Sequence, residues 1–155
     1  MRYTEAMSDA QLDSLTVPSP FYRVTAKAII LDDQARLLVV KNHNGNWELP
    51  GGGWEHDESF ESALAREIQE ELGVMADTIS DIYFTYRGIN IRRGFMTLRL
   101  AAPVTLQNYD FKLGHDILAT EFITREQFKE LDLQSNEGAV SEHADKIWQQ
   151  KSGSS

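Results

Sequence analysis

The sequence predicts one α/β (α+β layered) domain with helices packed on a mixed β-sheet, and three observations support that fold class. A chain of 155 residues has the usual size of one domain and can bury a core. Hydrophobic residues make up 41% and charged residues 25% of the chain, a balance typical of a globular protein. Strand and helix patterns alternate along its middle, which favours helices layered on a sheet.

The first half of the domain predicts three strands before its first long helix. Residues 21–31 are rich in β-forming residues, and residues 32–34 indicate a turn into a second strand at 36–41. We therefore expect these two strands to form a hairpin. A short strand at 47–50 then leads into a loop of three glycines at 51–53.

A strong helical pattern follows at residues 60–72. Ser59 is the expected N-cap, because its hydroxyl can accept a hydrogen bond from the first turn. Gly73 is the expected C-terminal stop, because glycine adopts the left-handed conformation that ends many helices.

The second half predicts three more strands and two more helices. Stretches rich in β-branched and aromatic residues predict strands at 79–91, 95–104 and 117–123, the first two joined by a turn that contains Arg92, Arg93 and Gly94. Amphipathic stretches predict helices at 124–131 and 137–150, the first of them capped by Thr124 with Gln127.

The two ends of the chain look different from this domain, which we place at 21–150. Residues 1–20 predict an N-terminal appendage, where Ser8 and Gln11 have the spacing of a capping box, and residues 151–155 predict a disordered tail. The first residues are too acidic and polar for a signal peptide, and no run approaches the roughly 20 apolar residues of a membrane span. With no cysteine in the chain, we expect a cytoplasmic protein without disulfides.

The formal net charge of −9 argues against a nucleic-acid polymer as partner, because such binding needs a basic face. A small anionic substrate remains compatible with that charge, since a bound divalent cation reverses the local field of an acidic site. Solubility alone is the alternative explanation of the negative charge.

The predicted helix at 60–72 places carboxylates where stability alone does not need them. On a helical wheel, one stripe is apolar and packs on the sheet, namely Leu64, Ile68 and Leu72. Beside it, three glutamates share an arc of about 100°, namely Glu67, Glu70 and Glu71. These like charges repel one another, and a hard divalent cation would remove the penalty. A solvated acidic face paired by Arg66 is the alternative.

The spacing of the whole segment 52–74, GGWEHDESFESALAREIQEELGV, is far more specific. It resembles the Nudix box, G-x5-E-x7-R-E-U-x-E-E-x-G-U with U aliphatic, at every defined position. The single-residue positions are filled by Gly52, Glu58, Arg66, Glu67, Glu70, Glu71 and Gly73, and the aliphatic positions by Ile68 and Val74. At ordinary residue frequencies the match has a chance on the order of 10⁻⁹ per start point.

The resemblance implies a Nudix-type α/β/α sandwich and a divalent-metal-dependent hydrolase. In that family the box holds divalent cations, usually Mg²⁺ with Mn²⁺ as a substitute, and water attacks a phosphorus of a diphosphate linked to a variable group. By resemblance, the metal ligands are Glu67, Glu70, Glu71 and the carbonyl of Gly51. Glu67 or Glu70 would also orient or deprotonate the water, and Glu58 would pair with Arg66 to hold the loop on the helix.

Residues outside the glutamate cluster are less specific candidates. A further catalytic acid from a downstream loop is common in the family, and here we favour Asp116 over Glu121 and Glu137. The backbone of Gly52 and Gly53 can approach a phosphate because it carries no side chains. Other phosphate-binding candidates are Lys41 and Arg87, each with the alternative of an exposed surface residue. Trp54 is the candidate for stacking, because a large aromatic side chain in this loop is expected to have little core to join.

The substrate itself is not specified by the sequence. The markers of ADP-ribose, dinucleoside-polyphosphate, NADH and coenzyme A subfamilies are absent, which leaves a small phosphorylated nucleotide derivative as the expected substrate. The resemblance also makes a homodimer a candidate assembly, and it gives no reason to expect a membrane partner. A non-catalytic Nudix-fold sensor of a nucleotide ligand is the alternative function.

Overall fold

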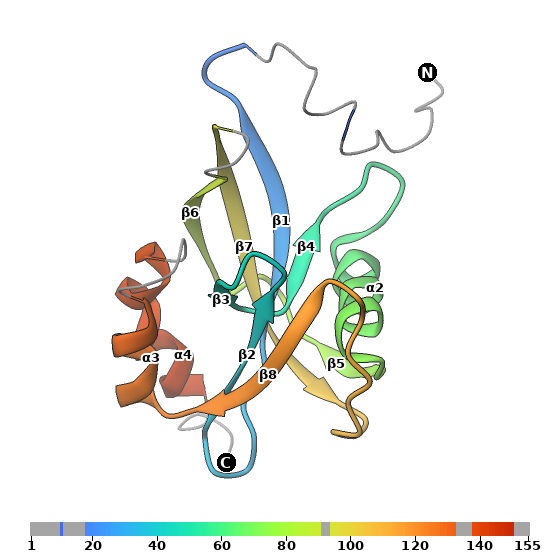
Figure 1. Cartoon of the computed structure of the whole chain (residues 1–155), viewed down its shortest axis with the longest axis vertical. Helices are drawn as coiled ribbons and strands as arrows, with labels where there is room; N and C mark the ends of the chain where they lie inside the picture. Colours follow the sequence, from blue (N-terminus) through green and yellow to red (C-terminus); the bar gives the residue numbers. More distant parts are fainter. Residues whose placement is uncertain (1–9, 11–17, 91–93, 133–137, 151–155) are drawn as a thin grey trace.

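The computed structural model describes residues 10, 18–90, 94–132 and 138–150, which form two β-sheets with helices on either side (Figure 1). The larger sheet contains β1 (Tyr22–Ile29), β4 (Gly51–Gly53), β5 (Ala76–Ile79), β6 (Phe84–Asn90) and β7 (Phe95–Leu106). The smaller sheet contains β2 (Leu37–Asn42), β3 (Trp47–Glu48) and β8 (Ile117–Ile123).

The larger sheet is mixed, as predicted. Strand β1 pairs in parallel with β7 and antiparallel with β4, so the glycine strand lies at the edge beside β1. Strands β5 and β6 pair antiparallel with β7. The glycines at 51–53 therefore form an edge strand where the sequence predicted a loop.

The helices cover the sheets from two sides (Figure 1). Helix α2 (Phe60–Leu72) packs on one side, over a core that includes Ala26, Leu38 and Ala102. Helices α3 (Arg125–Asp132) and α4 (Ala144–Gln149), with the 3₁₀ helix η1 (Gly138–His143), enclose a second core. The predicted α/β/α sandwich is confirmed. Among the described residues, no helix is both long and apolar enough to cross a membrane.

The predicted hairpin of residues 21–31 and 36–41 is wrong. Strands β1 and β2 belong to different sheets and approach each other only at their connection, through the bridge of Leu31 with Leu37 and the hydrogen bond from Leu38 N–H to the Ile30 carbonyl. Because β4 and β7 already occupy both edges of β1, β2 has no edge of β1 left to pair with.

Two other predicted elements are divided. The strand predicted at 79–91 is interrupted at residues 80–83, so that β5 and β6 each pair with a different part of β7. The last predicted helix is split into η1 and α4. Several sequence predictions lie outside the described residues, namely those on Ser8, Gln11, Arg92, Arg93, Glu137 and the tail 151–155.

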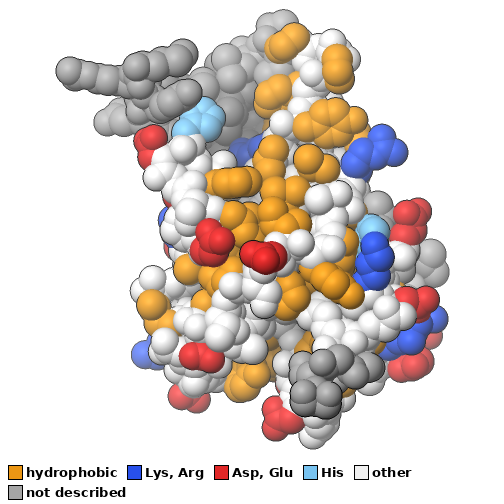
Figure 2. Space-filling view, turned by 180° about the vertical axis from the view of Figure 1, so that it is seen from behind, with side chains coloured by type: hydrophobic (Ala, Val, Ile, Leu, Met, Phe, Trp, Pro, Cys, Tyr) orange, Lys and Arg blue, Asp and Glu red, His pale blue; other side chains and the backbone are white. Residues whose placement is uncertain are grey.

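Seen from behind, apolar side chains gather in a band down the middle of the molecule (Figure 2). The register of the larger sheet sets Tyr22 of β1 and Ile89 of β6 against Met96 on β7. Tyr22 and Ile89 are 41% and 44% exposed. The described helices therefore leave an apolar row of the sheet open.

Candidate active site

Helix α2 has the boundaries that the sequence predicted. Ser59 caps it, with its hydroxyl accepting a hydrogen bond from the Ser62 N–H at 3.1 Å. Gly73 ends it in the left-handed conformation, at φ 68°, and donates its N–H to the Gln69 carbonyl. The apolar stripe of Leu64, Ile68 and Leu72 is fully buried. Because that stripe fixes the rotation of the helix, Glu67 and Glu71 lie beside the glycine strand.

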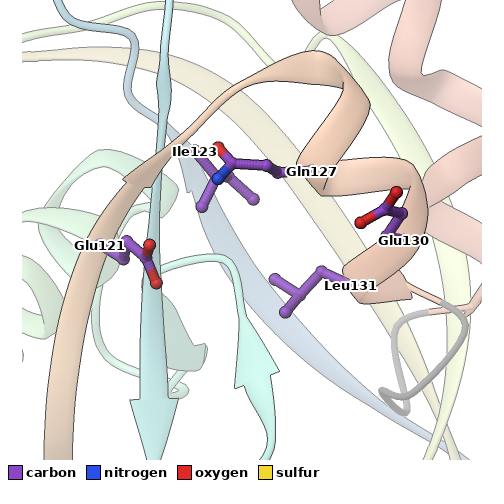
Figure 3. A pocket seen from close by; sticks show the side chains of 5 residues that line it. All are labelled: Glu121, Ile123, Gln127, Glu130 and Leu131. Carbon is purple, nitrogen blue, oxygen red and sulfur yellow. The ribbon is translucent and has the colours of Figure 1, made fainter.

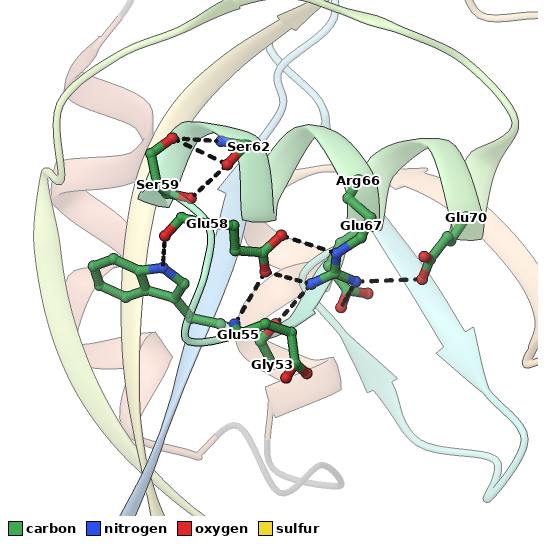
Figure 4. Close-up of polar contacts among 9 residues, drawn as sticks. Gly53, Glu55, Glu58, Ser59, Ser62, Arg66, Glu67 and Glu70 are labelled. Atoms are coloured by element: carbon green, nitrogen blue, oxygen red, sulfur yellow. Dashed lines mark hydrogen bonds and ion pairs between the residues drawn. The ribbon is translucent and has the colours of Figure 1, made fainter. Parts of the chain in front are cut away.

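Arg66 is the centre of a hydrogen-bonded network between α2 and the preceding segment (Figure 4). Its guanidinium binds both carboxylate oxygens of Glu58, at 3.1 and 2.7 Å, and also the Gly53 carbonyl at 3.0 Å. It further donates to Glu67 at 2.8 Å and to Glu70 at 3.4 Å. The predicted contact of Glu58 with Arg66 is present, and the bond from Arg66 to the Gly53 carbonyl ties strand β4 to the helix.

The charges of this network shift the acidity of its members. The hydrogen bonds from Arg66 hold the pKa of Glu58 below its usual value, and the same pairing raises the pKa of Arg66. Both side chains therefore stay ionised across the physiological pH range. The pair acts as a fixed brace and not as a proton donor or acceptor.

The glycines of β4 allow side chains of neighbouring elements to approach the backbone. A Cβ atom at Gly52 would lie 2.7 Å from both carboxylate oxygens of Glu67. A Cβ atom at Gly53 would lie 2.5 Å from a guanidinium nitrogen of Arg23. Gly51 has φ 128°, and a Cβ atom there would overlap the Ala26 carbonyl. Glycine is therefore required at position 51, and at position 52 it allows the Glu67 carboxylate to lie against the backbone.

Glu67 and Glu71 both reach the glycine strand. The Gly51 N–H donates a hydrogen bond to Glu71 at 2.9 Å, and the Glu67 carboxylate lies against Gly52. Burial raises the pKa of Glu71 to about 8, and burial also raises the pKa of Glu67. Glu70 differs, because its side chain is 61% exposed and contacts Arg66.

Lys27 is a residue of this site that the sequence reasoning missed. It lies on β1 opposite Gly51 and is only 4% exposed. Its ammonium donates to the carbonyls of Leu49 and Gly51, both at 3.1 Å, and lies 3.4 Å from a carboxylate oxygen of Glu48. The one available signal was a single lysine within the otherwise apolar stretch 26–31.

The donor set suits a hard divalent cation in its chemistry. Glu67, Glu71 and the Gly51 carbonyl offer only oxygen atoms, the ligands that Mg²⁺ prefers. A cation would also offset the burial that raises the pKa of both carboxyls. In the part of the chain that the structure describes, no three His, Asp or Glu side chains already converge as a metal cage. Glu70 shares a nitrogen of Arg66 with Glu67, at 3.4 and 2.8 Å, and its side chain is 61% exposed.

The two described downstream acids, Asp116 and Glu121, have different surroundings. Asp116 has a 68% exposed side chain that contacts His115 at 3.2 Å. The loop that carries Asp116 lies against the C-terminal end of α2, where the Gly114 N–H donates to the Glu71 carbonyl. Glu121 lines a pocket between β8 and α3 together with Gln127, Glu130 and Leu131 (Figure 3). Among the described residues, neither carboxylate forms a hydrogen bond or an ion pair with the glycine strand.

The candidate substrate-binding residues have different surroundings. Lys41 lies on β2 over the Trp47 ring, at 5.7 Å from its centroid. Arg87 is exposed on β6. Trp54 donates its indole N–H to the Glu58 carbonyl at 2.9 Å and packs edge-on against the buried Phe60. The expectation that Trp54 has little core to join is therefore wrong, although the residue is 37% exposed.

Comparisons with known proteins identify relatives of part of this chain. A MutT-like protein of Streptomyces ambofaciens is 35% identical over 80 residues, which are 51% of this chain and 50% of that protein. An RNA pyrophosphohydrolase of Saccharophagus degradans is 44% identical over 55 residues, 34% of this chain and 32% of that protein. The chain thus spans half or less of the length of these curated relatives.

A solved structure shares the fold over nearly the whole chain. The MutT protein from Methanosarcina mazei Go1 superposes with a TM-score of 0.70 at 18% identity, covering 89% of this chain and 100% of that one. The model of the NUDIX domain matches residues 21–143, which include both sheets, α2 and the glycine strand. The chain therefore belongs to the NUDIX family.

Proposed function

We propose that this protein is a divalent-metal-dependent hydrolase that cleaves a pyrophosphate linkage in a nucleotide or nucleotide derivative. The observation that carries the proposal is the meeting of Glu67 and Glu71 at the glycine strand, which the Glu58–Arg66 pair ties to α2. The names of the relatives, a MutT-like protein and an RNA pyrophosphohydrolase, support the same reaction class.

The metal centre would be held by Glu67, Glu71 and the Gly51 carbonyl, with Glu70 as the fourth donor. Mg²⁺ is the expected ion and Mn²⁺ its substitute, since both prefer oxygen ligands. A bound ion would polarise the phosphoryl oxygens and neutralise charge on the leaving phosphate. Gly52 and Gly53 are proposed to contact a phosphate through their backbone, because neither carries a side chain.

Water would attack a phosphorus atom of the diphosphate. A new bond forms between the water oxygen and phosphorus, the bond from phosphorus to the bridging oxygen breaks, and one water proton passes to a carboxylate. Glu67 suits the role of acceptor, because its carboxylate lies against the glycine strand at the proposed centre. Glu70 is the second candidate, since its exposed carboxylate can reach a water at the site's rim.

The substrate would be a small phosphorylated molecule whose remaining groups contact residues around the centre. Lys41 and Arg87 are proposed for phosphates, and the exposed edge of Trp54 for a base or sugar. Asp116 and Glu121 are tested as auxiliary acids by Asp116→Asn and Glu121→Gln, where unchanged turnover in both removes that role. A homodimer and a cytoplasmic location stay predictions.

The test is a hydrolysis screen of the purified chain. Nucleoside triphosphates, dinucleoside polyphosphates, ADP-ribose, nucleotide sugars, NADH and 5′-triphosphate RNA are supplied with and without Mg²⁺, beside Glu67→Gln and Glu70→Gln. Glu130→Gln is the matched control, because that carboxylate lines the pocket near α3. We expect Mg²⁺-dependent turnover that Glu67→Gln loses and Glu130→Gln keeps. Stabilisation by a ligand without any turnover would replace the hydrolase by a sensor.

A further inference from the structure

The ammonium group of Lys27 is buried beneath the proposed metal centre. Three N–H groups of the ammonium meet three acceptors, which are the Leu49 carbonyl, the Gly51 carbonyl and the Glu48 carboxylate. The residue is 4% exposed. A buried charge is tolerated when it is paired and fully hydrogen-bonded, and this ammonium meets both conditions.

One of these three acceptors has a second use. The Gly51 carbonyl is also the backbone oxygen that the proposed metal centre would employ. The pairing of β1 with β4 sets Lys27 directly opposite Gly51, so the lysine backbone cannot move away without breaking the sheet. The same peptide segment donates the Gly51 N–H to Glu71. A cation of the protein therefore contacts the segment from which a divalent ion would take its ligands.

We propose that the buried ammonium group of Lys27 competes with the divalent cation. Lys27 lowers the affinity of the centre for the metal ion, and it keeps the glycine strand in place when no ion is bound. This inference rests on the proposed function, because the metal centre belongs to the proposed hydrolase. Lys27 acts by two physical effects. Its positive charge repels an incoming cation across a poorly solvated space, and its hydrogen bond occupies a lone pair of the Gly51 carbonyl.

Three substitutions distinguish the effect of the Lys27 charge from the effect of its hydrogen bonds. Lys27→Gln removes the charge and keeps a donor, Lys27→Met removes both and keeps an apolar stem, and Lys27→Arg keeps the charge. Lys146→Gln on α4 is the control, since that lysine is exposed and belongs to another layer of the fold. The affinity of each purified full chain for Mn²⁺ is measured by calorimetry and by the loss of the electron paramagnetic resonance signal of free Mn²⁺.

We expect Lys27→Gln and Lys27→Met to bind Mn²⁺ about tenfold more tightly than the parent chain at a pH where Glu67 and Glu71 are ionised in every variant, because one positive charge near the ion is gone. Lys27→Arg and Lys146→Gln should stay within about twofold of it. Without metal, Lys27→Met should unfold at a lower temperature than the parent, and saturating Mn²⁺ should narrow that gap.

Unchanged or weaker Mn²⁺ binding in folded Lys27→Gln would overturn the inference and make Lys27 a residue that only positions the Gly51 carbonyl. If Lys27→Gln does not fold, the same criterion applies to Lys27→Met. Failure of the proposed function gives a different result, in which the parent chain itself binds no Mn²⁺ and hydrolyses nothing, and the inference falls with it.

Discussion

Two cations hold the glycine strand β4 from opposite sides, and they do so with different partners. Arg66, on α2, donates to the Gly53 carbonyl and to the carboxylates of Glu58, Glu67 and Glu70. Lys27, on β1, donates to the Gly51 carbonyl, with one carboxylate within reach. The side chain of Arg66 is 32% exposed, whereas that of Lys27 is 5% exposed.

The difference shows that the two cations hold one short strand in two ways. Arg66 neutralises carboxylates, so it limits the repulsion within the acidic face of α2. Lys27 binds mainly backbone carbonyls, so it fixes the position of the peptide that Glu71 contacts. The arginine is thus a partner of the acidic cluster, and the lysine is a support of the backbone beside it.

The largest effect on activity is expected from Gly52→Ala. Gly52 lies between Gly51, which contacts Lys27, and Gly53, which contacts Arg66. Its methyl group would meet the Glu67 carboxylate at 2.7 Å and displace it. We expect kcat of the hydrolysis to fall by about a hundredfold, as for a misplaced catalytic group. Steady-state kinetics under saturating Mg²⁺ measure it. Activity within twofold of the parent would show that the approach of Glu67 to the backbone is not needed.

Replacing Arg66, the more exposed of the two cations, tests its contribution to the stability of the metal-free protein. Arg66→Met removes the partner of Glu58 and leaves that carboxylate, whose side chain is only 16% exposed, without its counter-ion. We expect the free energy of unfolding to fall by about 2 kcal/mol. Urea titration followed by circular dichroism gives the value. A loss as small as that of an exposed ion pair, below about 0.5 kcal/mol, would contradict the role of the pair as a brace.

The same brace predicts a pH dependence. The hydrogen bonds from Arg66 hold the pKa of Glu58 below its ordinary value of 4.5. The folded state therefore binds this proton less readily than the unfolded state, so the pair contributes stability above pH 4.5 and loses it as the pH falls through the folded pKa. The stability difference between the parent and Glu58→Gln should shrink between pH 6 and pH 3. A constant difference in urea titrations at both pH values would refute it.

The smallest effect is expected at the N-terminus of α2. Ser59→Ala removes the hydroxyl that accepts from the Ser62 N–H. We expect a loss of about 1 kcal/mol in unfolding free energy, with the hydrolysis rate unchanged under folding conditions. Ser80→Ala, outside any helix, is the matched control. A change in rate without a change in stability would mean that the cap also orients the acidic face.

The contacts of Arg66 were predictable from the sequence, and those of Lys27 were not. The contacts of Arg66 lie within the box spacing, from one to thirteen residues away. Helix periodicity and cap chemistry therefore fixed α2, Ser59 and Gly73 correctly. The contacts of Lys27 are 21 to 24 residues away and depend on which strand lies beside β1.

The same limit explains the errors in the fold. Residues 21–31 and 36–41 have the pattern of a hairpin, but pairing of β1 with β4 and β7 is decided by the whole sheet. Local pattern specifies the type of an element, and partners distant in sequence specify its neighbours. Trp54 illustrates this for the site, because its packing on Phe60 depends on how the preceding segment folds back on α2.

The parallel pairing of β1 with β7 has a consequence for the order of folding. It joins partners such as Tyr22 and Met96, more than seventy positions apart, so a long loop must close before the pair contributes stability. Helix α2 and its brace need only local contacts and can form earlier. We expect the contact of Lys27 with Gly51 to form after the rate-limiting step. A divalent cation at this centre should therefore slow unfolding and leave the folding rate unchanged.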